Sequence, residues 1–239
     1  MNKIFNNDCI KIMNKINDNT IDCIITDPPY GVGFKNDIYN DSKEYVFNIY
    51  KQWLKEMYRI MKEDSHIYIF IPTLEIDKWI LSIKDVGFNF KNIITTKCKS
   101  YNYQKNNFKF DTQFIVFATK GKGRCFNKIN IQKTSESWLK DKRNKNQKEY
   151  SYDYNSLMYE YSTQLSKLKH PNEKSVEFIK KIILLSTSEN DIIIDPFMGS
   201  GSCIKACIET NRKYIGIELN KEIYENTKKQ IGDKYGYNE

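Results

Sequence analysis

Short apolar runs of strand length alternate along the chain with segments whose apolar residues recur at helical spacing. The run Ile21–Thr26 shows almost no polar alternation, which is typical of a strand covered on both faces. Residues 42–61 carry one apolar stripe and predict a long helix. This order of elements predicts an α/β fold with a mostly parallel, doubly wound sheet and helices on both faces.

The remaining elements follow from the same reasoning. Further strands are expected at residues 3–7, 66–71, 90–98, 113–118, 192–194 and 214–217. Further helices are expected at residues 9–16, 74–83, 173–185 and 202–209, and from residue 221 onward. A chain of 239 residues can bury a full core as one domain with a small insert.

The alternation is interrupted at residues 120–169, a polar segment too long for a simple crossover. It contains twelve Lys or Arg and five Asp or Glu, and so carries +7 of the net charge of +8. We predict that residues 1–119 and 170–239 form one domain and that residues 120–169 are an inserted element. A concentrated positive charge favours an acidic partner, with nucleic acid first, although a solvated lysine-rich loop has the same composition.

Several classes of protein are disfavoured by what the chain lacks. No apolar run reaches the roughly 18 residues that span a bilayer, and the first ten residues contain no long apolar signal region. Six cysteines without a C-x-x-C pair and two histidines are a poor ligand set for zinc. We expect a reduced, cytoplasmic chain with no membrane segment and no metal site. Cys203 and Cys207 are expected to pack on a helix.

Residues 191–219, "DIIIDPFMGSGSCIKACIETNRKYIGIEL", combine a strand, a glycine-rich turn, a helix, a second strand and an acid. Gly199 and Gly201 allow the backbone to approach a ligand closely, and the following helix directs free N–H groups towards it. Glu218 comes 17 residues after Gly201, where its carboxylate can accept hydrogen bonds from two ribose hydroxyls. The spacing is typical of an adenosine-cofactor site.

A dinucleotide is the first alternative ligand for this turn. The G-x-G-x-x-G fingerprint requires a small residue at position 204, where the chain has Ile204, and no P-loop Lys-Ser/Thr follows the glycines. An adenosine cofactor without a pyrophosphate, such as S-adenosylmethionine, fits better. A purely structural turn is the other alternative, but Asp195-Pro-Phe197 and Glu218 on either side of the glycines favour a site.

The strand Ile21–Thr26 is followed by Asp27-Pro28-Pro29-Tyr30. Because each proline holds the residue before it extended, Asp27 and Pro28 leave the sheet as a stiff segment. The Asp27 carboxylate and the Pro28 carbonyl can then act as two acceptors beside the ring of Tyr30. This arrangement suits an exocyclic amine on a planar ring, because holding both hydrogens directs the nitrogen lone pair outward. A Pro-Pro turn with a helix-capping Asp is the alternative.

These motifs resemble those of the DNA amino-methyltransferases, which combine D/N/S-P-P-Y/F with F-x-G-x-G. Here the first motif is near the N-terminus, the second near the C-terminus and the basic segment between them, as in the permuted β class. The resemblance covers nearly the whole chain except the insert. It implies methylation of double-stranded DNA with S-adenosylmethionine by a prokaryotic or phage-encoded protein. Homodimers and a cognate restriction endonuclease are further expectations from the same resemblance.

The resemblance assigns roles residue by residue. The catalytic motif is matched by Asp27, Pro28, Pro29 and Tyr30. Residues assigned to the cofactor are Asp8, Cys9, Asp27, Lys174, Asp195, Phe197, Gly199, Ser200, Gly201 and Glu218. The positive charge of the insert, not the resemblance, is the basis for expecting DNA contact from Lys140, Lys142, Arg143 and Lys145. Lys174 lies in a segment similar to the family's H-P-x-x-K-P, but Ser175 replaces the last proline, so a solvated lysine at a helix start is its alternative.

The target base is a separate question, since adenine N6 and cytosine N4 are both exocyclic amines. Either must be flipped out of a duplex to reach the motif. In the resembling family an Asp at the first motif position usually accompanies adenine and a Ser cytosine. Asp27 therefore favours N6-adenine, with N4-cytosine as the alternative. Methylation of RNA or of a protein amide, or a non-catalytic nucleic-acid-binding module, are the rival functions.

Overall fold

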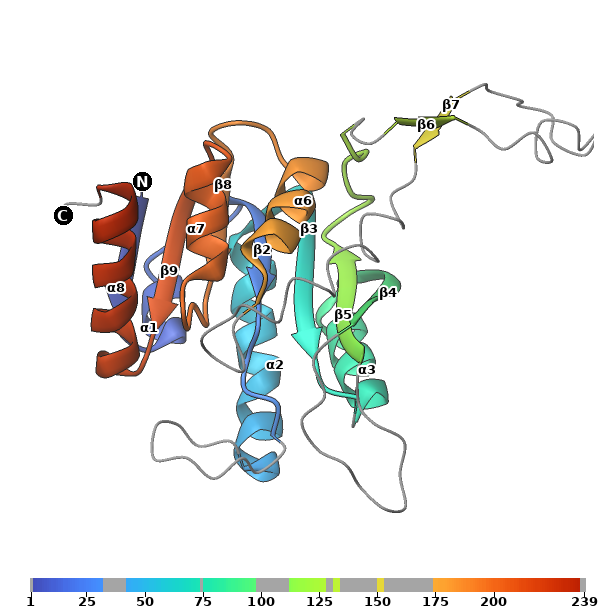
Figure 1. Cartoon of the computed structure of the whole chain (residues 1–239). Coiled ribbons are helices and arrows are strands. Elements are labelled where there is room, and N and C mark those ends of the chain that lie inside the picture. The colour runs from blue at the N-terminus through green and yellow to red at the C-terminus, as the bar shows by residue number, and fades with distance from the viewer. Residues whose placement is uncertain are drawn as a thin grey trace, which may run out of the picture.

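The computed structural model describes residues 2–31, 42–73, 75–97, 112–127, 131–133, 150–152 and 174–236. Its centre is a seven-stranded sheet with the order β1-β9-β8-β2-β3-β5-β4 (Figure 1). The parallel strands are β1 (Asn2–Asn6), β9 (Lys213–Glu218), β8 (Ile192–Asp195), β2 (Ile21–Thr26) and β3 (Met61–Ile71). Strand β5 (Thr112–Thr119) is antiparallel to both β3 and β4 (Asn89–Lys97). The predicted mostly parallel α/β sheet is confirmed.

Helices cover both faces of this sheet (Figure 1). One face carries α1 (Cys9–Met13), α2 (Lys43–Ile60) and α3 (Ile76–Val86), and the other carries α6 (Val176–Ser186), α7 (Ser202–Glu209) and α8 (Lys221–Tyr235). Strand β2 contributes to both cores, because Ile24 packs with the first set of helices and Ile25 with the second. Burial on both faces explains why its sequence lacks polar alternation.

Several element boundaries differ from the sequence prediction, and two of the differences have clear local physical reasons. Strand β3 begins at Met61 rather than at residue 66, because Met61 pairs with Ile21 before the register jumps to His66 opposite Cys23. The polar residues between them form a bulge that hydrophobicity does not reveal. Helix α1 ends at Met13 rather than at residue 16, because Lys15 and Ile16 donate to carbonyls only three residues back.

The predicted insert is described only in part. Strands β6 (Ile131–Lys133) and β7 (Tyr150–Tyr152) form a separate antiparallel pair. The predicted DNA contacts Lys140, Lys142, Arg143 and Lys145 lie outside the described residues. Within the described ranges, no helix is long and apolar enough to cross a membrane. Nor do those ranges contain a group of three or more His, Cys, Asp or Glu that could hold a metal ion.

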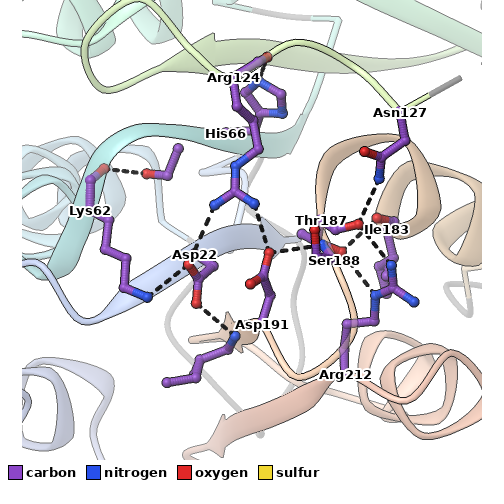
Figure 2. A network of polar contacts seen from close by, with 12 residues as sticks. Asp22, Lys62, His66, Arg124, Asn127, Ile183, Thr187, Ser188, Asp191 and Arg212 are labelled. Atoms are coloured by element: carbon purple, nitrogen blue, oxygen red, sulfur yellow. Dashed lines mark hydrogen bonds and ion pairs between the residues drawn. The ribbon is translucent and has the colours of Figure 1, made fainter.

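A dense polar network joins the amino ends of the parallel strands (Figure 2). Asp22 accepts from Lys62 Nζ at 2.8 Å and from the backbone N–H of Ile192 at 2.9 Å. Arg124 reaches Asp22 at 3.4 Å and Asp191 at 2.7 Å. We call this set the amino-edge network. It ties β2 and β3 to the segment before β8, and Arg124 brings the first residues of the predicted insert into the fold.

Candidate active site

Four predicted acidic residues lie at the opposite, carboxyl edge of the sheet. Asp8 follows β1, Asp27 follows β2, Asp195 ends β8 and Glu218 ends β9. Because these strands are parallel and adjacent, their carboxyl ends meet. The Thr26 hydroxyl donates to Asp195 Oδ1 at 2.8 Å and so joins segments 169 residues apart in the sequence. The fold thus places residues 27–30 beside residues 195–201. We call residues 27–30 the clamp motif and residues 195–201 the glycine loop.

The clamp motif leaves β2 with Pro28 buried and with Pro29 and Tyr30 half-buried. The Tyr30 hydroxyl donates to Asp27 Oδ1. On the other carboxylate oxygen, Lys174 Nζ lies 2.9 Å from Asp27 Oδ2. The Asp27 side chain remains 28% exposed. A carboxylate with a partner on each oxygen and an accessible side is oriented, yet it can still accept a hydrogen bond from outside.

Lys174 therefore lies at the clamp motif, just before Ser175, which caps α6 by accepting from the Phe178 N–H. Its ammonium is also 3.4 Å from Gln113 Oε1 and 5.1 Å from the centroid of the Phe70 ring. Sequence reasoning missed Gln113. It is the second residue of β5, and no local motif marks it, because its contact with Lys174 depends on how distant elements pair.

The two glycines of the glycine loop serve different purposes. Gly199 has φ +50°, and the nearest atom that an added Cβ would meet is the Phe197 carbonyl oxygen at 3.9 Å. Its outer side is therefore open to a ligand. Gly201 has φ +75°, but an added Cβ would lie 2.6 Å from Thr227 Cγ2 of α8. Gly201 allows the loop to pack against α8, which also donates from Thr227 Oγ1 to the Gly199 carbonyl at 2.8 Å.

Ile204, the residue that departs from the dinucleotide fingerprint, has a structural counterpart in β9. A Cβ on Gly216 would lie 2.9 Å from Ile204 Cδ1 and 2.5 Å from Met198 Sδ. The close approach of helix and strand, which the third glycine of a dinucleotide fingerprint provides, is here provided by Gly216 in the strand. The absence of a small residue at position 204 is thus compatible with the same layout of strand, turn and helix.

Glu218 is held in place by backbone groups. Its Oε2 accepts from the Gly199 N–H at 3.0 Å and its Oε1 from the Asn220 N–H at 2.8 Å. Burial raises the pKa of this carboxyl group. Each carboxylate oxygen keeps capacity for one more donor, which fits two neighbouring ribose hydroxyls. The donor set and the open side of Gly199 are compatible with an adenosine group at this edge.

Asp8 is brought to the same edge by the pairing of β1 with β9. The Asn7 N–H donates to the Glu218 carbonyl at 3.1 Å, which holds the end of β1 against the end of β9. Asp8 Oδ1 accepts from the Lys11 N–H at 3.0 Å and caps α1. Cys9 is buried, and burial raises the pKa of its thiol to about 12. Cys9 therefore acts through packing rather than as a thiolate.

The other predicted loop residues mainly contact the protein itself. Asp195 Oδ1 also accepts from the Phe197 N–H at 3.1 Å, and burial raises the pKa of the Asp195 carboxyl to about 7. The Phe197 ring packs edge-on against Trp53 of α2, with centroids 4.7 Å apart. The Ser200 hydroxyl lies 3.4 Å from that of Ser202. These contacts fix the shape of the glycine loop.

A doubly wound sheet with this topology and these two motifs at its carboxyl edge is the fold of S-adenosylmethionine-dependent methyltransferases. The chain belongs to the DNA methylase family N6_N4_Mtase, which matches residues 21–229. It is 30% identical over 241 residues to the type II methyltransferase M.HpaI of Haemophilus parainfluenzae, covering 95% of this chain and 73% of that protein.

Solved structures agree with this assignment. The S-adenosylmethionine complex of M1.HpyAVI matches with a TM-score of 0.66 and 28% identity, covering 96% of this chain and all of the other. The cytosine-N4-specific PvuII DNA methyltransferase shares the fold at 15% identity, with a TM-score of 0.67, covering 95% of this chain and 84% of the other. The prediction of an S-adenosylmethionine-dependent DNA methyltransferase is confirmed.

Proposed function

We propose that this DNA methyltransferase methylates the exocyclic N6 of an adenine flipped out of double-stranded DNA. The observation that carries the proposal is the hydrogen bond from Thr26 to Asp195, which seats the clamp motif directly beside the glycine loop. An amine held by the first motif would then lie next to a cofactor held by the second. S-Adenosylmethionine, when bound, supplies an electrophilic methyl group.

The clamp motif acts on the amine. The Asp27 carboxylate and the Pro28 carbonyl accept hydrogen bonds from its two N–H groups, which lets the nitrogen become tetrahedral and direct its lone pair outward. Positive charge develops on the nitrogen during transfer, so these acceptors stabilise the transition state more than the ground state. The Tyr30 ring replaces part of the stacking that the flipped base loses, while its hydroxyl helps to orient Asp27.

The proposed cofactor contacts divide into two groups. Glu218, Asp8 and the open side of Gly199 face the adenosine portion, with Glu218 accepting from the ribose hydroxyls. Asp195, Phe197, Ser200, Gly201 and Cys9 shape the surrounding backbone through packing and internal hydrogen bonds. Lys174, although the resemblance assigns it to the cofactor, contacts Asp27.

Adenine is favoured as the target because the first residue of the clamp motif is an Asp. N4-cytosine remains the alternative, since the PvuII enzyme shows that the same fold also serves cytosine. The direct test is to incubate the protein with DNA and labelled S-adenosylmethionine, digest the product to nucleosides and identify the methylated nucleoside by mass spectrometry. We expect N6-methyladenine from the wild-type chain and no methylated base from Asp27→Ala. Recovery of N4-methylcytosine would show the base assignment to be wrong.

We further propose that residues 120–169 recognise the target DNA and that residues 1–119 and 170–239 form the catalytic domain. Two of the insert's cations are engaged in the fold: Lys120 is buried and donates to the Met61 carbonyl at 2.8 Å, and Arg124 bridges Asp22 and Asp191. We therefore assign DNA contact to later residues of the insert, including Lys140, Lys142, Arg143 and Lys145. A homodimer and a partner endonuclease stay predictions.

Salt titration tests this assignment. Each phosphate contact makes log affinity fall with log salt by roughly 0.9. Neutralising Lys140, Lys142, Arg143 and Lys145 together should flatten that slope by up to about 3.6 if all four contact phosphates. Melting curves should confirm that the quadruple variant stays folded. An unchanged slope would move the DNA surface to another part of the chain.

A further inference from the structure

We propose that Lys174, held in place by Gln113 and Phe70, is a positioning residue for the Asp27 carboxylate. The inference rests on the proposed function, because it concerns the same clamp motif. It gives Lys174 a role different from the cofactor contact that the resemblance implies. It also gives Gln113 a role that no sequence motif indicates.

The Asp27 carboxylate is fixed by partners from two elements. Rotation of a carboxylate about its last torsion is soft, so one partner would leave its plane loosely defined. Here Tyr30 from the same loop donates to Oδ1, and Lys174 from the segment just before α6 contacts Oδ2 at 2.9 Å. Contacts on both oxygens define the direction of the remaining lone pairs, which the substrate amine must meet.

Lys174 is itself constrained, as a positioning group must be. Its side chain is only 22% exposed, and its ammonium contacts Gln113 Oε1 and the face of Phe70 as well as Asp27. The Gln113 amide is fixed in turn, since its Nε2 donates to the carbonyls of Ile71 at 2.9 Å and Phe114 at 3.2 Å. With both amide hydrogens directed to the backbone, Oε1 is left to face Lys174. The contact chain therefore runs from the end of β3 to Asp27.

Electrostatics limits what Lys174 can contribute. A fixed ammonium beside Asp27 opposes the positive charge that develops on the amine, so it cannot assist transfer by charge alone. Its benefit must come from orientation, which is sensitive to small displacements of the reacting groups. We therefore expect a smaller effect from removing Lys174 than from removing Asp27. A guanidinium at position 174 should partly restore the carboxylate contact.

The experiment compares Lys174→Ala, Lys174→Arg and Gln113→Leu under single-turnover conditions with saturating DNA and cofactor. The control is Lys180→Ala, because Lys180 lies on α6, the helix that follows Lys174, is 23% exposed and pairs with Glu177 and Glu209 instead. We expect Lys174→Ala to slow methyl transfer about 10-fold, as a misplaced reacting group does. Lys174→Arg should recover part of this loss. Gln113→Leu should cost about threefold, because it removes one long, 3.4 Å hydrogen bond from the ammonium and leaves the contact with Asp27 in place.

Cofactor affinity, measured by calorimetry on the same variants, separates the two roles of Lys174. Positioning predicts an affinity for S-adenosylmethionine that changes by less than about twofold in Lys174→Ala, because the cofactor contacts lie elsewhere. Weakened cofactor binding with an unchanged transfer rate would overturn the proposal and restore the cofactor role. An equal loss of rate in Lys180→Ala would also overturn it, because the effect would then belong to α6 in general.

A readout independent of methylation tests the contact itself. In a double-mutant cycle of Asp27→Asn and Lys174→Gln, the shifts in melting temperature should deviate from additivity by about 2 °C. Additive shifts with normal wild-type transfer would refute the pairing and leave the proposed function standing. A wild-type chain that methylates no base would refute the proposed function and, with it, this role of Lys174, whatever the cycle shows.

Discussion

Two aspartates at opposite ends of β2 show how one residue type is used in two ways. Asp22, near the amino end, has a side chain only 6% exposed and receives Lys62, Arg124 and the Ile192 N–H (Figure 2). Asp27, just past the carboxyl end, is 28% exposed and receives Tyr30 and Lys174. The first carboxylate is enclosed by partners within the fold, whereas the second is oriented and left accessible.

The same contrast extends across the two edges of the sheet. In the amino-edge network the acids face cations, as buried charges require. Arg212 behind it also donates to the carbonyls of Thr187 and Thr210. At the carboxyl edge, neither Asp195 nor Glu218 forms an ion pair with a residue that the structure describes; hydroxyl and N–H groups bind them instead. Negative charge is thus compensated by cations throughout the amino-edge network, whereas at the carboxyl edge Asp27 pairs with Lys174 and the charges of Asp195 and Glu218 are left to hydroxyl and N–H groups and to a ligand.

Replacing each of the two aspartates by alanine should give the largest effect, a difference in unfolding free energy between the two variants. Asp22→Ala removes the acceptor of Lys62, Arg124 and the Ile192 N–H, but Lys62 is 43% exposed and Arg124 keeps Asp191. We therefore expect a loss of about 3 kcal/mol of unfolding free energy, at the low end for a broken buried pair. Asp27→Ala should cost less than about 1 kcal/mol, because its pairing is partly exposed. Urea denaturation measures both. Equal losses of stability would remove the distinction between a structural and a functional edge.

Glu218 offers the next largest effect, on binding rather than folding. Glu218→Ala removes the acceptor for two ribose hydroxyls, so the affinity for S-adenosylmethionine should fall by about 2–4 kcal/mol if both charge-assisted hydrogen bonds are lost. Calorimetry measures the affinity, and a denaturation curve shows whether the variant is folded. Unchanged affinity for S-adenosylmethionine in a folded variant would contradict the assignment of Glu218 to the cofactor.

Local sequence patterns predicted most of the fold and both motifs of the site. Strand β2 and helix α7 have the predicted bounds, because apolar periodicity and turn residues act within a few positions. Glycine chemistry predicted a ligand loop at residues 199–201, although the structure shows that only Gly199 faces open space. The resemblance added the family, and the comparisons confirm it.

Contacts between distant segments could not be predicted in this way. Lys174 meets Gln113 across 61 residues of sequence, and Arg124 meets Asp22 across 102. The compensation of Ile204 by Gly216 likewise depends on how α7 packs on β9. The early start of β3 at Met61 was missed because the residues that follow Met61 are polar and bulged. Each of these features follows from strand order, which periodicity alone does not specify.

The smallest expected effect, counted per pH unit, concerns Asp195, whose burial without a cation among the described residues raises the pKa of its carboxyl to about 7. An unfolded Asp titrates near 3.9, so between about pH 4 and pH 7 the folded chain binds the extra proton. This contribution to stability is therefore complete below about pH 4 and is lost as pH rises towards 7. One group changes stability by at most about 1.4 kcal/mol per pH unit. Asp195→Asn keeps the acceptor for Thr26 and Phe197 but cannot ionise, so its stability relative to wild type should rise with pH in denaturation series from pH 4 to 8. Parallel curves for the two proteins would show that Asp195 ionises freely and that this edge is better compensated than its contacts indicate.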